Sequence, residues 1–488
     1  MSLAVLTAAA LTSAQTAPIS VHDVFDREIT SRGVTLTDWE GHIANPAIRL
    51  SLKARPELQL PARIDLAASN ARIAFDLPSR LTEAGPSKVV SLTKASPAAD
   101  IWITIFPDYN GQDEAHSLTI RIEDANEHEF RLDVPIHVLD QDQTRNLDYK
   151  IVCDFSHDQS GFFENSTAKQ LTQRAADDWA YFLADQKFDP VAPGSEKAWI
   201  WDLDNAFTSG REIVVAQGVE GTLLFIHGIR GREKRSGGIA SDRSGIHTRA
   251  GEPTGLRRSG TISIEVTGNW NELGWQFLQP DEHYERSGNQ RAMQHDFYSI
   301  VRHEIGHAIA FHRVHPALSR LERNRQIVSR VLSDYLGRNP AVAEVEHFYD
   351  TIDPVSRVGV FGNEYGGDFP RKRWIITKFD LLALKAMGWL LRETTPFQTL
   401  RLLAPASLKM SVGKPSGLAL TASGGVPTYR FSVASGSLPP GVALDSFTGE
   451  FAGTPSAKGV YRLTVEVRDQ DPTAKPVRKT LAIEVGKT

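Results

Sequence analysis

Hydrophobic and polar residues alternate in short runs along the N-terminal part of the chain. The clearest runs are 47–53 (AIRLSLK), 101–106 (IWITIF) and 117–123 (SLTIRIE), and turn-forming residues such as 107–111 (PDYNG) lie between them. Alternation places the apolar side chains on one face of a strand, and frequent turns without helical spacing favour two packed sheets. The pattern predicts a β-sandwich over residues 21–146, in which we find no motif with catalytic chemistry.

The spacing of apolar residues changes near residue 147. Across 166–185 they recur every three or four positions, which predicts a helix that begins after a cap at Asn165 or Ser166. Beyond this helix, stretches with the alternating pattern of strands are interspersed with stretches that have helical spacing. We expect strands at 212–216, 222–226 and 261–266, and helices from about 295, over 318–338, and over 377–390 with Thr377 as cap.

Strict alternation returns after a proline-containing hinge at 395–397. Residues 461–467 (YRLTVEV) and 480–485 read as strands, and glycine and proline residues between such runs are typical of turns. This part of the chain predicts a separate β-sandwich over residues 400–488.

The composition of the chain indicates which kinds of binding partner to expect. The chain has 488 residues, of which 41% are hydrophobic and 23% charged, so several globular domains are expected. The net charge of −5 gives no basic excess, and we therefore expect no nucleic-acid partner. No stretch provides the roughly 20 apolar residues of a membrane-spanning helix, so no transmembrane segment is expected.

The N-terminus and the cysteine content bear on the compartment. Residues 1–20 carry no charge and include the apolar run 3–11, which is typical of a signal peptide without its basic region, or else of a disordered tail. We favour export. Cys153 is the only cysteine, which excludes an intramolecular disulfide and cysteine-rich zinc modules, and its apolar neighbours favour a buried packing role.

Residues 303–307 read His-Glu-Ile-Gly-His, the HExxH pattern of zinc peptidases. On a helix, His303 and His307 lie one turn apart, so both imidazoles project toward one ion. Glu304 lies beside them, where its carboxylate can take a proton from a zinc-bound water and pass it to the leaving amine. Gly306 is a poorer helix former than alanine by about 1 kcal/mol, which indicates close packing at this position.

The surrounding stretch VRHEIGHAIAFH (301–312) resembles the active-site helix of the metzincin zinc peptidases, whose pattern is HExxHxxGxxH. Residues 376–389 (ITKFDLLALKAMGW) are similar to the helix that closes such domains, and 166–185 to the helix that opens them. The resemblance implies an α+β zincin-type catalytic domain over 147–395. It also implies that 261–266 is the edge strand that pairs with an extended peptide substrate.

The chain departs from the family pattern after His307. The family glycine falls on Ala310 and the third histidine ligand on Arg313. The family's Met-turn has no methionine here, because none lies between residues 316 and 386, and Val360-Phe361-Gly362 is the expected substitute.

The third zinc ligand therefore has to be found elsewhere. On an unbroken helix neither His312 nor His315 could reach the ion, so the chain must turn after about Ala310. We prefer His315, which a longer loop can fold back, and keep His312 as the alternative. The remaining ligand candidates are three downstream carboxylates, Glu322, Glu344 and Glu346. His347 and Tyr365 are weaker candidates, for a contact to the oxyanion and not for a metal ligand.

The C-terminal part resembles the immunoglobulin-like (cadherin-like) modules of bacterial secreted and surface proteins. The resemblance rests on turn motifs in a fixed order: Ser435-Gly436, Leu438-Pro439-Pro440-Gly441, Thr448-Gly449 and Gly453-Thr454-Pro455. It implies a spacer or adhesive domain and a secreted, periplasmic or cell-surface location.

Together these features predict a bacterial multidomain zinc endopeptidase that hydrolyses protein or peptide substrates. Its expected site contains one Zn²⁺ on His303, His307 and His315, with Glu304 as general base and His312 as the alternative third ligand. The Ig-like domain is expected to bind a cell-surface or matrix ligand. The competing hypothesis is a non-catalytic adhesin in which zinc is structural.

Overall fold

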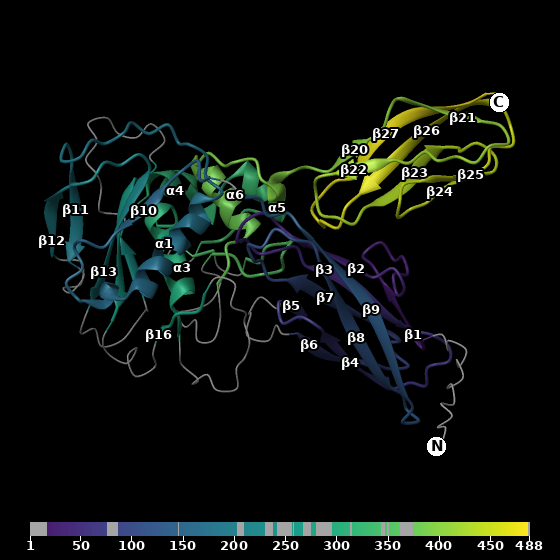
Figure 1. The fold of residues 1–488 in the computed structure, drawn as a ribbon, viewed down its shortest axis with the longest axis horizontal. Coiled ribbons are helices and arrows are strands. Elements are labelled where there is room, and N and C mark those ends of the chain that lie inside the picture. Colours follow the sequence, from purple (N-terminus) through teal and green to yellow (C-terminus); the bar gives the residue numbers. More distant parts are fainter. Residues whose placement is uncertain are drawn as a thin grey trace, which may run out of the picture.

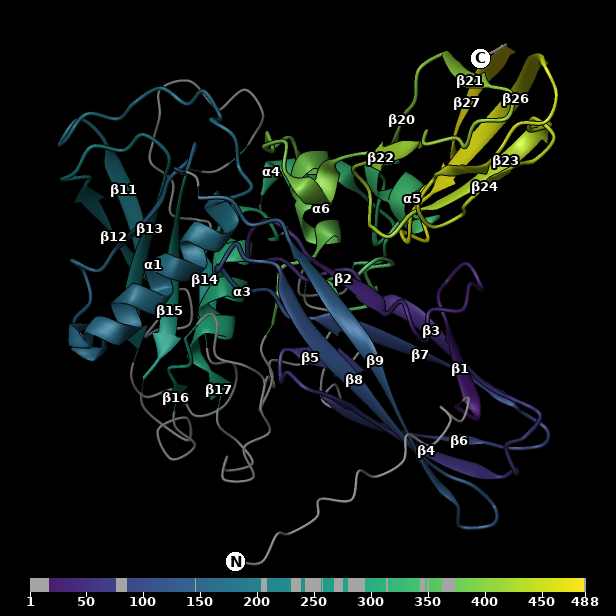
Figure 2. The same cartoon turned by 45° about the vertical axis from the view of Figure 1, so that its right-hand side comes forward.

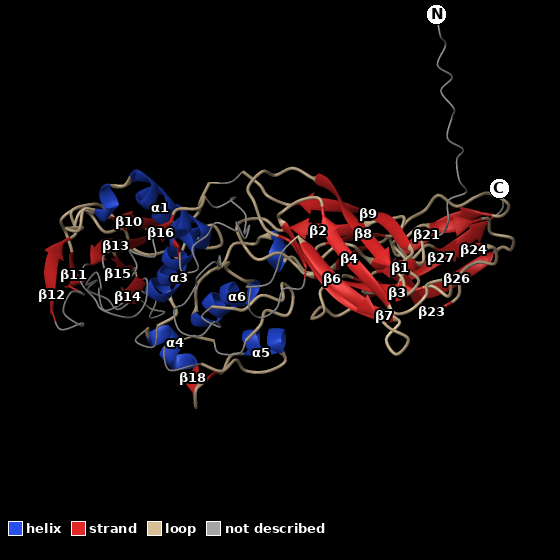
Figure 3. Ribbon diagram, turned by 90° about the horizontal axis from the view of Figure 1, so that it is seen from below, coloured by secondary structure: helices blue, strands red, loops and turns tan. Residues whose placement is uncertain are grey.

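The chain forms an N-terminal pair of sheets, a middle domain that contains the helices, and a C-terminal β-domain (Figure 1). Viewed from below and coloured by secondary structure, the helices gather in the middle domain and the long strands lie to one side (Figure 3). The computed structural model describes residues 17–75, 86–144, 146–202, 209–229, 238–241, 256, 258–266, 275–279, 295–312, 315–342, 347–348, 351–361 and 374–486.

The N-terminal part is a sandwich of two sheets, as the alternating pattern predicts. One sheet has the strand order β1 (Ile19–His22), β3 (Ile48–Ala54), β7 (Ala98–Ile105), β5 (Ile73–Phe75). The other has the order β2 (Val34–Asp38), β9 (Glu129–Asp140), β8 (Glu114–Glu123), β4 (Ala62–Ala68), β6 (Ser87–Leu92). Alternate side chains of both sheets, such as Leu50 and Ile120, are buried in a shared core.

The middle domain is built on a four-stranded sheet with the order β10 (Ile151–Asp154), β13 (Thr222–Ile229), β15 (Ser259–Glu265), β14 (Gly238–Ser241). The first three strands are parallel, and β14 is antiparallel to β15. Helices α1 (Ser166–Ala180) and α3 (Phe297–Ile309) pack against each other and against this sheet. The side chain of Asn165 accepts hydrogen bonds from the backbone of Thr167 and Ala168, so the predicted cap of α1 is confirmed.

The prediction of a substrate-pairing edge strand at 261–266 is wrong. These residues form β15, whose two sides are paired with β13 and β14. Among the described strands, the sheet ends at β10 on one side and at β14 on the other, because each of these pairs with one neighbour. The apolar alternation of 261–266 is that of an interior strand, buried between α3 and its neighbours.

The prediction of a single helix over 318–338 is also wrong. The segment folds as α4 (Pro316–Leu321), a short hairpin of β18 (Glu322–Arg323) and β19 (Gln326–Ile327), and α5 (Arg330–Leu336). Asn324 and Arg325 have φ values of 52° and 60°, in the left-handed region that a helix cannot include.

The middle domain and its C-terminal end contain further short elements. They are η1 (Phe162–Glu164), the hairpin β11 (Lys197–Asp202) with β12 (Ser209–Val214), the pair β16 (Trp275–Gln276) with β17 (His295–Asp296), α6 (Lys378–Met387) and η4 (Thr395–Phe397). Helix α6 begins at Thr377, which forms a capping box with Asp380, and ends at Gly388 with φ 107°, as predicted.

The C-terminal domain has its own core, which includes Phe431, Phe451 and Val465. Its main sheet has the order β21 (Ser407–Ser411), β27 (Val477–Gly486), β26 (Gly459–Arg468), β23 (Arg430–Gly436). Two smaller pairs complete it: β20 (Arg401–Leu403) with β22 (Thr421–Ser423), and β24 (Val442–Leu444) with β25 (Phe451–Gly453).

The three parts contact one another. A single hydrophobic cluster runs from the N-terminal sandwich into the middle domain. Arg27 of the sandwich donates to the carbonyl oxygens of Tyr429 and Ser446, at 3.1 and 2.7 Å, in the C-terminal domain. Lys378 of α6 pairs with Asp471 of the same domain at 3.6 Å. Figure 2 shows the sandwich and the C-terminal domain next to each other on one side of the helices. Among the described residues, no helix has the length and apolar character needed to cross a membrane.

Candidate metal centre

Helix α3 carries the HExxH motif into the interior. Every residue of the helix is buried, including His303 at 4% exposure, Glu304 at 8% and His307 at 9%. The two imidazoles lie one turn apart with ring centroids separated by 4.7 Å. The helix ends at Ile309, and Ala310 adopts φ −152° instead of the left-handed conformation that glycine favours. The chain therefore turns where the sequence requires it, without a glycine.

His347 completes a cluster of three imidazoles. One ring nitrogen each from His303, His307 and His347 lies within 4.8 Å of the other two. The Nε2 atoms of His307 and His347 are 3.0 Å apart. Two nitrogen ligands at about 2.0–2.1 Å from a tetrahedral zinc lie about 3.3 Å apart, so this spacing suits a shared ion. Of the three rings, that of His347 is the most exposed, so solvent reaches the cluster from its side.

The cluster is held in the neutral form that a metal requires. Burial and the neighbouring imidazoles lower the pKa of His303 well below 6.5, and burial followed by His347 does the same for His307. Burial lowers the pKa of His347 to about 4. The carbonyl oxygen of Phe311 lies 2.5 Å from His307 Nδ1, so Nδ1 is the protonated nitrogen and Nε2 presents its lone pair to the cluster.

The structure corrects the preferred third ligand. His315 is buried at 1% exposure, but its Nε2 lies 3.2 Å from the carbonyl oxygen of Ala308, and the residue caps α4 ahead of Pro316. His312 lies in the turn, where its backbone N–H donates to the carbonyl of Ala310. Neither belongs to the three-imidazole group. The ring of His315 thus contacts the last turn of α3 at Ala308 and does not join the imidazole group.

The other residues that the sequence singled out near the motif lie outside this group or outside the described residues. Glu322 lies at the C-cap of α4 and also outside the group. Glu344, Glu346, Tyr365, Arg313 and Gly362 lie outside the described residues. Sequence reasoning missed His347 because it follows His307 by 40 positions with no fixed spacing. The sequence offered His347 only as a weak candidate for an oxyanion contact, and no spacing rule marked it as a metal ligand.

Phe361, from the expected substitute for a Met-turn, packs against two imidazoles of the cluster. Its ring stacks on His303 at 4.4 Å and 5°, and it meets His307 edge-on at 4.8 Å. The backbone N–H of Phe361 donates to Asp380 of α6 at 2.8 Å, so the helix cap also holds this residue in place. Gly306 makes room for it, because a Cβ there would lie 2.4 Å from Phe361 Cε2 and 3.0 Å from Trp179 Cζ2.

A second group of possible ligands lies in the sandwich, formed by Asp38, Asp108 and Asp140. Arg72 already occupies this group, because its guanidinium pairs with Asp38 and Asp108, and with Glu114 at 2.7 Å. A fixed guanidinium supplies the positive charge that a cation would otherwise bring. The group is therefore a structural ion-pair network.

Cys153 is buried on β10, and burial raises the pKa of its thiol, which is consistent with a packing role.

Comparison with known proteins identifies the C-terminal domain. The family model described as "Putative Ig domain" matches residues 399–484, as the turn motifs predicted. No curated protein matches the chain. A "putative alpha-galactosidase" of Bacteroides fragilis is 27% identical over 18% of this chain and 18% of its own, with a TM-score of 0.16. The chain thus spans less than a fifth of that protein's length. A conjugative transposon lipoprotein of Bacteroides eggerthii is 14% identical over 24% of this chain and 96% of its own, with a TM-score of 0.17.

Replacing Gly306 by alanine is expected to destabilise the protein by about 1–3 kcal/mol, because the new methyl group overlaps the ring of Phe361. The double variant Gly306→Ala/Phe361→Leu removes the ring edge and should recover part of the loss. Urea unfolding of the single and double variants measures both. Equal stability of Gly306→Ala and wild type would contradict this packing.

The metal-free protein is expected to lose stability as the pH falls from 6.5 toward 4. His347 has a folded pKa of about 4 against 6.5 for the ordinary side chain, so the unfolded chain takes up the proton first. His347 alone contributes a loss of about 3 kcal/mol over this window. His347→Gln should therefore show a shallower fall than wild type in urea titrations at each pH, and parallel curves would refute the assignment.

Proposed function

We propose that the middle domain is a zinc-dependent endopeptidase of the zincin type, and that His303, His307 and His347 bind the metal. The observation that carries the proposal is the buried cluster of three neutral imidazoles, two of them from the HExxH motif that also contains Glu304. Imidazole nitrogens are preferred zinc ligands, and three protein ligands leave one position for water or substrate.

The three histidine nitrogens are a set of ligands that suits zinc. Bound at this centre, zinc supplies a Lewis acid that makes water acidic and polarises a peptide carbonyl. Phe311 and Phe361 fix the rings of the ligand histidines through a carbonyl contact and a stack. These contacts keep the imidazoles in the tautomer and orientation that binding needs.

Glu304 is the proposed general base. Its position directly after His303 places a carboxylate beside the ligand pair, on a helix that is buried throughout. In that position the carboxylate accepts a proton from the attacking water and returns it to the leaving amine. A structural metal site has no need for this carboxylate.

The proposed substrate is an extended peptide. Strand β14 is the outer strand of the sheet and is antiparallel to β15, and its outward main-chain groups offer the hydrogen bonds that an added strand requires. Helix α3 packs against β14, which connects this strand to the motif. The role first assigned to residues 261–266 thus passes to β14.

As a second proposal, the protein is exported and its Ig-like domain serves as an adhesive or spacer module. The family match covers 399–484, and the domain buries its own core. In the alternative, non-catalytic reading, this domain and the N-terminal sandwich bind a surface or matrix ligand and the metal is structural. The two readings differ in the need for Glu304.

Replacing Glu304 by glutamine separates the two readings. The amide keeps the size of the side chain but cannot accept the proton, so zinc content should stay at the wild-type level while peptide hydrolysis falls by about 100–10,000-fold. Zinc analysis together with hydrolysis of casein and of a mixed peptide library provides the measurement. If wild type and variant both hold zinc and neither cleaves any peptide, the binding-protein reading replaces the enzyme.

A further inference from the structure

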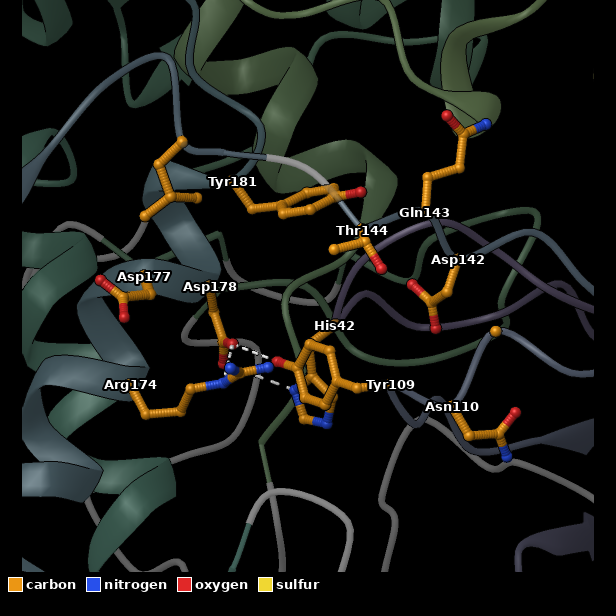
Figure 4. A pocket seen from close by; sticks show the side chains of 12 residues that line it. His42, Tyr109, Asn110, Asp142, Gln143, Thr144, Arg174, Asp177, Asp178 and Tyr181 are labelled. Carbon is orange, nitrogen blue, oxygen red and sulfur yellow. Dashed lines mark hydrogen bonds and ion pairs between the residues drawn. The ribbon is translucent and has the colours of Figure 1, made fainter.

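The N-terminal sandwich and the metal-bearing helix meet at a buried carboxylate. Asp178 of α1 is 2% exposed and lies between Tyr109, from the segment after β7, and Tyr298, from the first turn of α3. Tyr109 donates its hydroxyl to Oδ1 of Asp178 and Tyr298 donates to Oδ2. Figure 4 shows Asp178, His42 and Tyr109 together on the wall of a pocket of about 320 Å³ between the sandwich and α1.

Arg302 extends this contact along α3. Its guanidinium is fully buried, lies 3.1 Å from Asp178 Oδ2, and lies 2.6 Å from Nδ1 of His42 in the sandwich. A guanidinium only donates hydrogen bonds, so Nδ1 of His42 is the acceptor in this contact. The ring of His42 also stacks on Tyr109 at 5.1 Å and 15°.

The carboxylate is ionised and the two phenols are neutral donors. Burial alone would raise the pKa of Asp178, but the imidazole of His42, whose Nδ1 lies 3.4 Å from Oδ2, and then the guanidinium groups of Arg302 and Arg174 lower it below the ordinary 3.8. Burial, followed by the charge of Asp178, raises the pKa of Tyr109 and of Tyr298 well above 10. The network is therefore a buried ion pair that also receives hydrogen bonds from two neutral phenols.

Arg302 is the residue directly before His303, so its surroundings fix the helix at the ligand pair. The indole Nε1 of Trp179 donates to the carbonyl oxygen of Arg302 at 2.9 Å. The guanidinium lies 5.6 Å from the ring centroid of Trp374, whose ring in turn meets His303 edge-on at 5.8 Å. A rotation of α3 about its axis would break these contacts and displace the imidazoles together.

We propose that His42 and Tyr109 of the N-terminal sandwich are positioning residues for the metal centre, acting through Asp178 and Arg302 on the helix that carries His303 and His307. The proposal rests on the proposed metal site. It makes the sandwich part of the metal-binding unit, in contrast to a separable binding module. The loss of an acceptor beside a buried guanidinium is unfavourable, and a shift of the helix relieves this cost.

Paired substitutions at His42 test the hydrogen bond itself. Asparagine keeps an acceptor oxygen near the position of Nδ1, whereas leucine has nearly the same shape and no acceptor. Tyr109→Phe removes one hydroxyl from the other side of the network. His137, exposed on β9, provides matched Asn and Leu controls within the same sandwich. All variants are made in the full chain.

Two readouts are measured. Hydrogen exchange of residues 297–309 in the metal-free protein reports the clamp on α3, and competition with a chelator reports zinc affinity. We expect His42→Leu and Tyr109→Phe to raise exchange in α3 and to weaken zinc binding by about 10-fold, as loss of outer partners does at metal sites. His42→Asn and both His137 variants should stay near wild type, and β13 should be unaffected.

The outcomes are distinguishable. If His42→Leu leaves both α3 exchange and zinc affinity at the wild-type level, or if His42→Asn is as impaired as His42→Leu, the positioning role is refuted. If His42→Leu fails to fold by circular dichroism, Tyr109→Phe decides by the same two readouts. If wild type binds no zinc, the proposed function fails, and the exchange data alone still decide whether the sandwich clamps α3.

Discussion

A fully buried arginine directly before the proposed metal-ligand pair is the constraint on which this part of the structure depends. Arg302 cannot lose its charge, so the fold must surround it with acceptors and aromatic faces. Asp178 supplies the opposite charge from α1, and His42 supplies an acceptor from the sandwich. The contacts of this one guanidinium therefore join the N-terminal sheets, the opening helix and the HExxH helix into one unit with a shared core.

One turn further along the same helix, the packing depends on an aromatic ring. Gly306 lets Phe361 approach the helix, and Phe361 stacks on His303 while Asp380 holds its backbone. The flat ring thereby supports the imidazole of His303. Helix α3 is thus held at Arg302 by charge and, one turn later, at Gly306 by shape.

Local features of the fold were predictable from sequence and non-local ones were not. Alternation located the sandwich strands, and Asn165 and Thr377 marked the starts of their helices, because caps act within one turn. Strand order was not encoded locally, so β15 was mistaken for an edge strand. His347 and His42 reach the site from 40 and 260 positions away, and no periodic pattern links them to the motif.

The central claim is that His347, and not His315, completes the metal site. Zinc stoichiometry and affinity of wild type, His347→Ala and His315→Ala test it most directly, with circular dichroism to verify that each variant is folded. The account predicts one tightly bound zinc in wild type, its loss in His347→Ala, and its retention in His315→Ala. Retention of zinc by folded His347→Ala together with its loss from folded His315→Ala would contradict the account.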